Sequence, residues 1–269
     1  MKPGFELTQV LITVMTYPYP STKYQETVCT AGITTSGDWV RLYPVDYRYR
    51  PKHQKFRKWQ WVEIALSPRG HGTDQRIESR EPDLSTLRIL GEPLSNRDNW
   101  RARRETIDGL PHHTVKQLKS LYDTKRVSLG IVRPKRVLDL KVTPIAHEWP
   151  AKYQTLWSQL RLFGRQKPLY KIPYKFQYVF ECEDSDKPHN VMNEDWELGV
   201  LFLKERERLG SDDAAIKSVR HNFFEVMCRE NRDTRFFMGT RHPYNEWLVI
   251  GTFWPPRAKA GPLLAPQVR

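Results

Sequence analysis

The sequence predicts a β-rich α+β fold in which short strands form small barrels or sandwiches that carry helical insertions. Short runs of β-branched and aromatic residues, separated by Gly, Pro and Asp turns, are typical of such architectures. Segments with apolar residues at helical spacing interrupt these runs. A length of 269 residues suggests one large domain or two small ones, at about 100–200 residues per domain.

Five strands are predicted at the start of the chain, joined by short turns. The proline-containing segment Tyr17–Ser21 ends the first strand, because proline donates no hydrogen bond to a central ladder. Ser36–Asp38 has turn residues and precedes the third strand. In that third strand Trp39, Arg41 and Tyr43 share one face, since side chains alternate along a strand. The five strands are expected over residues 10–16, 27–33, 39–43, 59–66 and 76–80.

The rest of the chain mixes helices with further strands. Thr114 is expected to cap a helix in which Val115 and Leu118 face the core. Another helix is expected over Asp195–Leu209, and Gly210–Asp213 has the residues that close one helix and cap the next. Further strands are expected over residues 128–132, 137–142, 176–182, 235–240 and 247–253.

Composition excludes several classes of protein. Hydrophobic residues make up 39% and aromatic residues 12% of the chain, which provides a core and excludes wholesale disorder. The longest apolar runs, such as Val200–Leu203, are far shorter than the roughly 20 residues of a membrane span. Cys29, Cys182 and Cys228 are too widely spaced for a disulfide framework or a zinc pattern. We therefore expect a cytoplasmic protein without a membrane partner.

Positive charge is concentrated in the first two thirds of the chain. The formal net charge is +13. Residues 1–180 carry 31 Lys and Arg against 16 Asp and Glu, whereas residues 181–269 carry 13 against 15. A basic field confined to one part of a protein is typical of polyanion binding, because each neutralised phosphate releases counterions. The charge distribution therefore predicts a nucleic-acid partner.

Aromatic residues lie among these cations and indicate the candidate site. Aromatic rings stack on bases while cations contact phosphates, so the combination favours single-stranded nucleic acid. The basic segment 48–58 and an arginine cluster near residue 101 supply most of the candidates, although a solvated loop or a core strand explains the same residue types. The candidate nucleic-acid-binding residues are Trp39, Arg41, Tyr43, Arg48, Tyr49, Arg50, Lys52, Lys55, Arg57, Lys58, Arg101, Arg103 and Arg104.

The acidic segment 181–197 is the strongest candidate for catalysis. Carboxylates with a nearby histidine can hold a divalent ion for phosphodiester hydrolysis. However, Glu183–Asp186 is typical of an exposed turn, and Asp195 is placed as a helix cap. We therefore assign no catalytic residue, no metal ligand and no cofactor. Two alternatives stay open: a metal-dependent nuclease or nucleotide-processing enzyme that uses these acids, and an adaptor that docks a protein partner on the near-neutral C-terminal half.

Several short sequence motifs are distributed over nearly the whole chain. They are Thr16–Pro18, Tyr24–Cys29, Trp39–Pro44, Ser128–Lys135, Asp195–Gly199, Phe236–Thr240, Ile250–Phe253 and Pro255–Pro256. Together they resemble the bacterial dual OB-domain family, although none of them is a catalytic signature.

The resemblance implies two OB-like small β-barrels with helical insertions. It also implies a role in nucleic-acid transactions, in a prokaryotic defence or genome-conflict system. On this basis residues 1–125 are expected to form a basic OB-like barrel with a helical segment. Residues 126–256 are expected to form a second OB-like β-domain with two helices, and residues 257–269 a loose tail.

Overall fold

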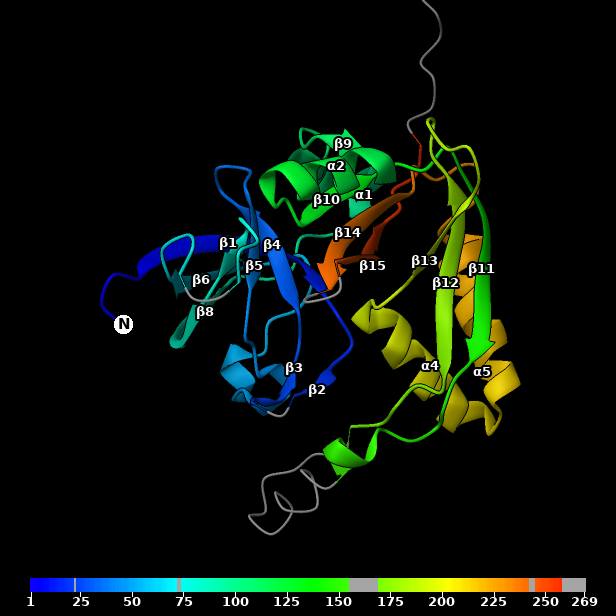
Figure 1. The fold of residues 1–269 in the computed structure, drawn as a ribbon, viewed down its shortest axis with the longest axis horizontal. Coiled ribbons are helices and arrows are strands. Elements are labelled where there is room, and N and C mark those ends of the chain that lie inside the picture. The colour runs from blue at the N-terminus through cyan, green and yellow to red at the C-terminus, as the bar shows by residue number, and fades with distance from the viewer. Residues whose placement is uncertain (22, 72–73, 155–168, 242–244, 258–269) are drawn as a thin grey trace, which may run out of the picture.

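The computed structural model describes residues 1–257 except 22, 72–73, 155–168 and 242–244. Of the predicted loose tail, residues 258–269 lie outside the described residues. The fold is β-rich with few helices, as the sequence predicts. Figure 1 shows a curled sheet on one side, strands with two covering helices on the other, and β10, β14 and β15 between them.

Six strands of the first half form one curled sheet in the order β7-β5-β4-β1-β6-β8. Only Glu81 separates β7 from β8, yet β7 pairs in parallel with β5 and β8 pairs antiparallel with β6. The segment from β7 to β8 therefore lies along both edges of the sheet, which curls back on itself. The six strands are β1 (Glu6–Met15), β4 (Thr30–Thr34), β5 (Trp39–Leu42), β6 (Gln60–Leu66), β7 (Ser79–Arg80) and β8 (Pro82–Leu90).

A small hairpin and two short helical turns lie in the connections of this sheet. The hairpin of β2 (Tyr19–Ser21) and β3 (Gln25–Thr27) occupies the connection from β1 to β4. The turns η1 (Tyr47–Tyr49) and η2 (Lys52–Gln54) follow β5. Helix α1 (Arg97–Ile107) comes after β8 and leads to the second half.

The second half contains two smaller sheets. One has the order β15-β14-β10-β9 and the other β11-β12-β13, and a parallel bridge from Asn193 to Val249 connects them. The strands are β9 (His112–His113), β10 (Leu129–Val132), β11 (Arg136–Pro144), β12 (Tyr174–Glu181), β13 (His189–Met192), β14 (Arg235–Arg241) and β15 (Glu246–Phe253). The helices are α2 (Val115–Lys125), α4 (Trp196–Leu209) and α5 (Asp212–Arg220), and the π-helical turn η3 (His221–Val226) follows α5.

Side-chain caps fix where these helices begin, at the positions that the sequence predicts. Thr114 and Gln117 form a capping box at the start of α2. The Asp195 carboxylate accepts a hydrogen bond from the backbone N–H of Glu197 at 2.9 Å. Gly210 adopts a left-handed φ of 65° after α4, a conformation that glycine tolerates best.

The two halves share a core. One buried cluster contains Leu11 and Ile33 of the first sheet together with Ile131, Phe237 and Ile250 of the second half. Helix α2, which the sequence analysis places in the first domain, contributes side chains to another cluster that is otherwise built from second-half strands and helices. Buried apolar side chains therefore form a continuous core across the junction between the two halves.

Cys29, Cys182 and Cys228 are free cysteines in this structure. Burial raises the pKa of the Cys228 thiol to about 12. Within the part of the chain that the structure describes, no helix is long and apolar enough to cross a membrane.

Candidate nucleic-acid interface

A groove of about 670 Å³ lies where the two halves meet. It is bounded by the segment just before β6, by α1, by α4 and by the end of β15. Its six aromatic residues are Tyr47, Phe56, Trp59, Trp100, Trp196 and Trp254. Its charged residues are the cations Arg57, Lys58, Arg103 and Lys204 and one acid, Glu197. We call this site the basic groove; it brings together three of the predicted residues, Arg57, Lys58 and Arg103.

Arg103 lies against two tryptophan rings of the basic groove. Its guanidinium carbon is 4.8 Å from the ring centroid of Trp59 and 5.0 Å from that of Trp100. Its Nε donates a hydrogen bond to the carbonyl oxygen of Leu94 at 2.8 Å. Burial lowers the pKa of Arg103 to about 10, so the side chain stays charged at neutral pH. The two rings and this hydrogen bond therefore hold the cation in a fixed place.

Both of these tryptophans have a left-handed backbone. The φ angle is 68° at Trp59 and 63° at Trp100. A bulky residue pays a steric penalty in this region, and such residues cluster at functional sites. The surrounding fold therefore holds the two rings in positions that the local backbone does not favour.

Lys58 is buried at the wall of the basic groove and joins the two halves. Its Nζ lies 3.0 Å from the Asp195 carboxylate and 3.0 Å from that of Glu197. Burial opposes the charge of Lys58, but the two carboxylates outweigh burial and raise its pKa. The same lysine lowers the pKa of Glu197. The expectation that Lys58 is a surface cation is wrong, because carboxylates of the second half enclose it.

The exposed cations of the basic groove are Arg57 and Lys204. The Arg57 side chain is 63% exposed and pairs with Glu92 at 2.6 Å. Lys204 is exposed, and among the described residues it forms no ion pair within 4.0 Å. Because surface ion pairs contribute only about 0–1 kcal/mol, Arg57 can exchange its partner for a phosphate at little cost.

The predicted face of β5 is not an exposed stacking surface. Arg41 is only 1% exposed, and its guanidinium donates hydrogen bonds to the carbonyl oxygen and hydroxyl of Ser128 at 3.0 and 3.1 Å. Trp39 is half-buried and packs its ring against Phe237. The expectation for Arg41 is wrong because the second half covers this face. Tyr43 lies beyond that contact and is 38% exposed.

Most of the basic segment before β6 is tied to nearby acids. Arg48 pairs with Glu26 at 3.0 Å and Arg50 with Asp46 at 2.6 Å. In the turns η1 and η2 and just after them, Tyr49 and Lys55 are half-buried and Lys52 is exposed. None of these five residues lines the basic groove.

The arginines of α1 take different positions. Arg101 is 74% exposed and pairs with Asp98 at 3.1 Å. Arg104 pairs with Asp108 at 3.4 Å and donates a hydrogen bond to the carbonyl oxygen of Pro256. Only Arg103 of this cluster lines the basic groove.

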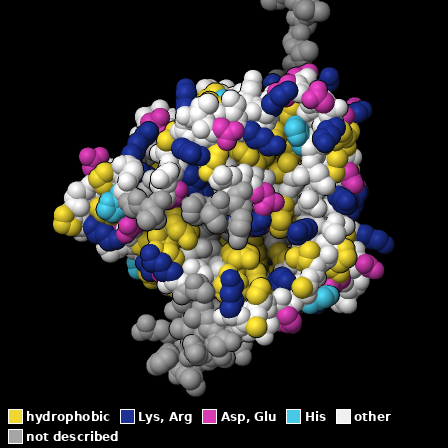
Figure 2. Space-filling model, in the orientation of Figure 1, with side chains coloured by type: hydrophobic (Ala, Val, Ile, Leu, Met, Phe, Trp, Pro, Cys, Tyr) yellow, Lys and Arg dark blue, Asp and Glu magenta, His cyan; other side chains and the backbone are white. Residues whose placement is uncertain are grey.

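Cations are also spread over the molecular surface. Figure 2 shows Lys and Arg side chains on both halves of the face in view, while hydrophobic side chains gather in a hollow near its centre. The basic residues on this face therefore do not form one continuous strip.

Several acids of residues 181–197 have separate partners. Glu181 pairs with Arg136 at 3.3 Å and Glu183 with Lys135 at 3.5 Å. Asp184 accepts a hydrogen bond from the Thr114 hydroxyl at 2.6 Å. Over the described residues, no group of three or more His, Cys, Asp or Glu is arranged to hold a metal ion.

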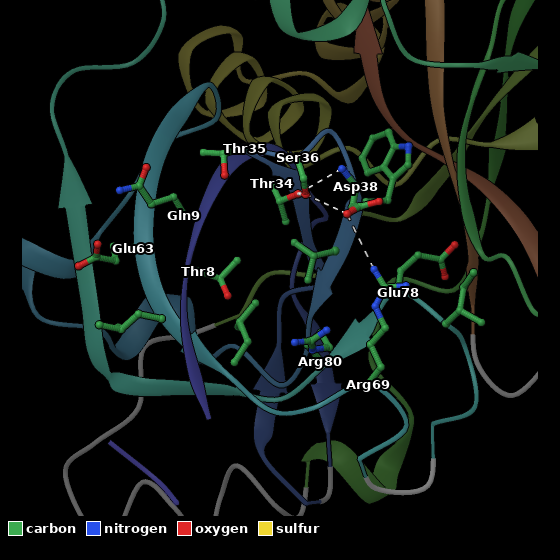
Figure 3. Close-up of a pocket in the computed structure, with 15 residues that line it drawn as sticks. Thr8, Gln9, Thr34, Thr35, Ser36, Asp38, Glu63, Arg69, Glu78 and Arg80 are labelled. Carbon is green, nitrogen blue, oxygen red and sulfur yellow. Dashed lines mark hydrogen bonds and ion pairs between the residues drawn. The ribbon is translucent and has the colours of Figure 1, made fainter. Parts of the chain in front are cut away.

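A second pocket, of about 390 Å³, is polar and lies within the first sheet. Figure 3 shows Arg69 beside Arg80. Arg69 reaches toward Asp38, whereas Glu63 lies on the opposite side of the pocket. The Arg69–Asp38 distance is 4.0 Å. Burial and the neighbouring Arg69 together lower the pKa of Arg80. The pocket has mixed charge and lacks the ring-and-cation pattern of the basic groove.

Two family models match the chain. One covers residues 111–268, which is more than half of the chain, and is described as Domain of unknown function (DUF8757). The chain belongs to this DUF8757 family. Residues 6–109 match a second model, described as Domain of unknown function (DUF8758). The DUF8757 match begins just before β9, so that it includes α2 as well as the sheet β15-β14-β10-β9.

Comparisons with curated proteins and with solved structures gave different results. No curated protein matches the chain. A solved structure of a murine DNA-binding protein bound to double-stranded DNA is similar over 95% of this chain and 98% of that chain. The TM-score is 0.31 and the sequence identity 9%.

Proposed function

We propose that the protein binds nucleic acid, with a preference for single strands, in the basic groove. The observation that carries the proposal is the composition of this groove, in which four cations and six aromatic residues meet with one acid. Cations that follow a phosphate backbone and rings that accept bases are the two components of single-strand binding sites.

Phosphates are expected to bind at the exposed cations. Arg57 comes from the first half and Lys204 from helix α4 of the second, so the two lie on walls that different parts of the chain provide. Arg57 presents a planar fork that suits a phosphate, whereas Lys204 acts as a point charge.

Bases are expected to lie deeper in the groove. Trp196 and Trp254 are only half-buried, which leaves part of each ring accessible. The guanidinium of Arg103 is planar and can also stack on a base. In a duplex the faces of the bases are already stacked, and this is why the proposal favours single strands.

Of the two OB-like barrels that the resemblance implies, the first is supported by the strand pairing of the first half. In the first half, β1 pairs with both β4 and β6, and the segment β7–β8 closes the sheet between β5 and β6. OB barrels are five-stranded, partly open and bind oligonucleotides.

Reversing the charge of Arg57 and Lys204 tests this proposal. In fluorescence anisotropy with a labelled single-stranded oligonucleotide, the variant Arg57→Glu, Lys204→Glu is expected to bind about tenfold or more weakly. Its salt dependence should also be shallower, by about 0.7 in the log–log slope for each phosphate that the variant no longer neutralises.

Arg88→Glu is the matched control. Arg88 is 68% exposed and pairs with Glu63 at 2.6 Å, as Arg57 pairs with Glu92, but it lies outside the basic groove. Equal loss of affinity in Arg88→Glu and in the groove variant would show non-specific attraction and contradict the proposal. A parallel titration with the duplex of the same sequence checks the strand preference.

The biological setting and a protein partner are proposed from observations other than the basic groove. The resemblance supports a role in prokaryotic defence or genome conflict. The near-neutral balance of residues 181–269 supports docking of a protein partner there. Affinity capture with the full chain tests both ideas, since a stable partner that also binds Arg57→Glu, Lys204→Glu would use a surface distinct from the groove.

A further inference from the structure

A pocket of about 320 Å³ lies beside the basic groove, on the other side of the first turn of α4. Leu198 and Gly199 line this pocket, whereas Trp196 and Glu197 line the groove. Asp195 lines the pocket, while its ion-pair partner Lys58 lines the groove. The two sites are therefore neighbours separated by one helical turn.

The walls of this pocket are aromatic. Tyr19 meets Trp149 edge to face, with ring centroids 5.4 Å apart, and Tyr19 is 48% exposed. Tyr17 forms another wall, and its hydroxyl donates a hydrogen bond to the carbonyl oxygen of Tyr170 at 2.8 Å. Rings that face a cavity of this size accept a flat ligand by stacking.

The position of Tyr17 depends on a glycine in α4. A Cβ atom built on Gly199 would lie 2.4 Å from the Tyr17 ring and 2.9 Å from Ile172. The helix backbone therefore approaches the ring more closely than any other residue type allows. The close packing of Gly199 against Tyr17 therefore fixes the position of this aromatic wall.

A buried polar group without a partner also lines the pocket. Asn193 is 4% exposed, and its Nδ2 forms no hydrogen bond within the described structure. Its Oδ1 is occupied, because it accepts a hydrogen bond from the backbone N–H of Asp195 at 2.9 Å. A buried donor left unpaired costs about 1–3 kcal/mol, so a ligand that supplies an acceptor gains by binding here.

Charge in the pocket is close to balanced, which favours a neutral ligand. Arg241 is shared by two carboxylates, with Glu194 at 3.5 Å and Glu246 in direct contact. Lys171 donates hydrogen bonds to the carbonyl oxygens of Ala146 and Glu148. Asp195 is neutralised by Lys58. The pocket therefore offers aromatic rings and a hydrogen-bond donor. Its net electrostatic field is too small to attract a free phosphate strongly.

We propose that this pocket binds a single unstacked nucleobase, stacked on Tyr19 within the aromatic walls and recognised on its edge by the Asn193 amide. A nucleobase is flat, neutral and carries hydrogen-bond acceptors on its edge. Proteins that read one base take it out of the stack and place it in an aromatic pocket. The inference rests on the proposed function for a strand as the source of the base, and a free nucleotide would offer the same chemistry.

Calorimetric titration of the full chain with the individual nucleoside monophosphates tests the pocket itself. At least one of them is expected to bind, and ribose 5-phosphate, which lacks the base, about tenfold or more weakly. Tyr19→Ala is expected to weaken nucleotide binding about fivefold or more, because the stacking partner of the base is removed. Asn193→Asp keeps the Oδ1 acceptor but replaces the donor, and is expected to change the order of preference among bases.

Tyr170→Ala is the matched control, since Tyr170 is 64% exposed and its side chain does not line the pocket. Nucleotide binding no stronger than that of ribose 5-phosphate would overturn the inference. Equal behaviour of Tyr19→Ala, Asn193→Asp and Tyr170→Ala would overturn it as well.

Oligonucleotides with and without one abasic position distinguish the two sources of the base. If the base comes from a strand, the abasic position weakens binding to the unaltered chain but not to Tyr19→Ala. Monophosphate binding without strand binding would make the pocket a free-nucleotide site and refute the proposed function alone. Strand binding that responds to Arg57→Glu, Lys204→Glu but not to the pocket variants would refute the pocket alone.

Discussion

Replacing Lys58 with alanine is expected to lower the free energy of unfolding by about 3–5 kcal/mol, the range for removing one partner of a buried ion pair. The Lys58 side chain is 6% exposed and the Asp195 side chain 1% exposed. Without the lysine, the Asp195 carboxylate stays buried with no cation to compensate its charge. Urea denaturation followed by circular dichroism measures the difference.

Two comparisons isolate the ion pair. Lys204→Ala removes an exposed cation from the same groove and is expected to change stability by no more than about 0.5 kcal/mol. The double variant Lys58→Met, Asp195→Asn removes both buried charges and keeps a side chain able to cap α4, so it should recover part of the loss. Equal stability of Lys58→Ala and Lys204→Ala would contradict the description of Lys58 and Asp195 as a buried ion pair.

Arg41→Ala is the second substitution with a large expected effect, again about 3–5 kcal/mol of destabilisation. The guanidinium bonds to Ser128, whose hydroxyl in turn donates to the Glu78 carboxylate at 2.8 Å. Removal of the side chain leaves a cavity and takes the cation away from the Glu78 carboxylate, which is only 7% exposed. Arg41→Lys should not restore stability, because an ammonium does not reproduce the planar fork.

The same variant distinguishes a structural arginine from a binding arginine. At a temperature where Arg41→Ala is still folded, its affinity for single-stranded oligonucleotides is expected to equal that of the unaltered chain. Arg88→Ala, an exposed paired arginine, serves as the stability control, with an expected loss of about 1 kcal/mol or less. Full stability combined with a loss of affinity would restore the interpretation of Arg41 as a nucleic-acid ligand.

Local patterns were sufficient to predict much of the secondary structure. The strands at residues 39–43 and 128–132 and the starts of α2 and α4 follow from alternation and capping residues that act over a few positions. Strand β13 (His189–Met192) was missed, because its apolar residues are too few to stand out. The helix that Gly210–Asp213 is expected to cap is short, because α5 ends at Arg220 and a π-helical turn follows it.

The site depends on tertiary packing that a local pattern does not contain. Alternation predicts a shared face for Trp39, Arg41 and Tyr43, but it does not predict what that face packs against. Their charge and their basic surroundings predict Arg57 and Arg103 as binding residues. Lys204 and Trp254 are not predicted, because each of these two lies in a segment without a basic run. Only the packing of the two halves brings these four residues into one groove.

The core cluster that Leu11 and Ile33 form with Ile131, Phe237 and Ile250 also determines how the molecule can be divided. The two family matches meet near residue 110, but a cut at that point would expose apolar side chains on both fragments. Heat or denaturant should therefore melt the whole chain in one cooperative transition, and neither fragment should be a self-sufficient module. Deletion series that separate these regions would report on misfolding before they report on activity.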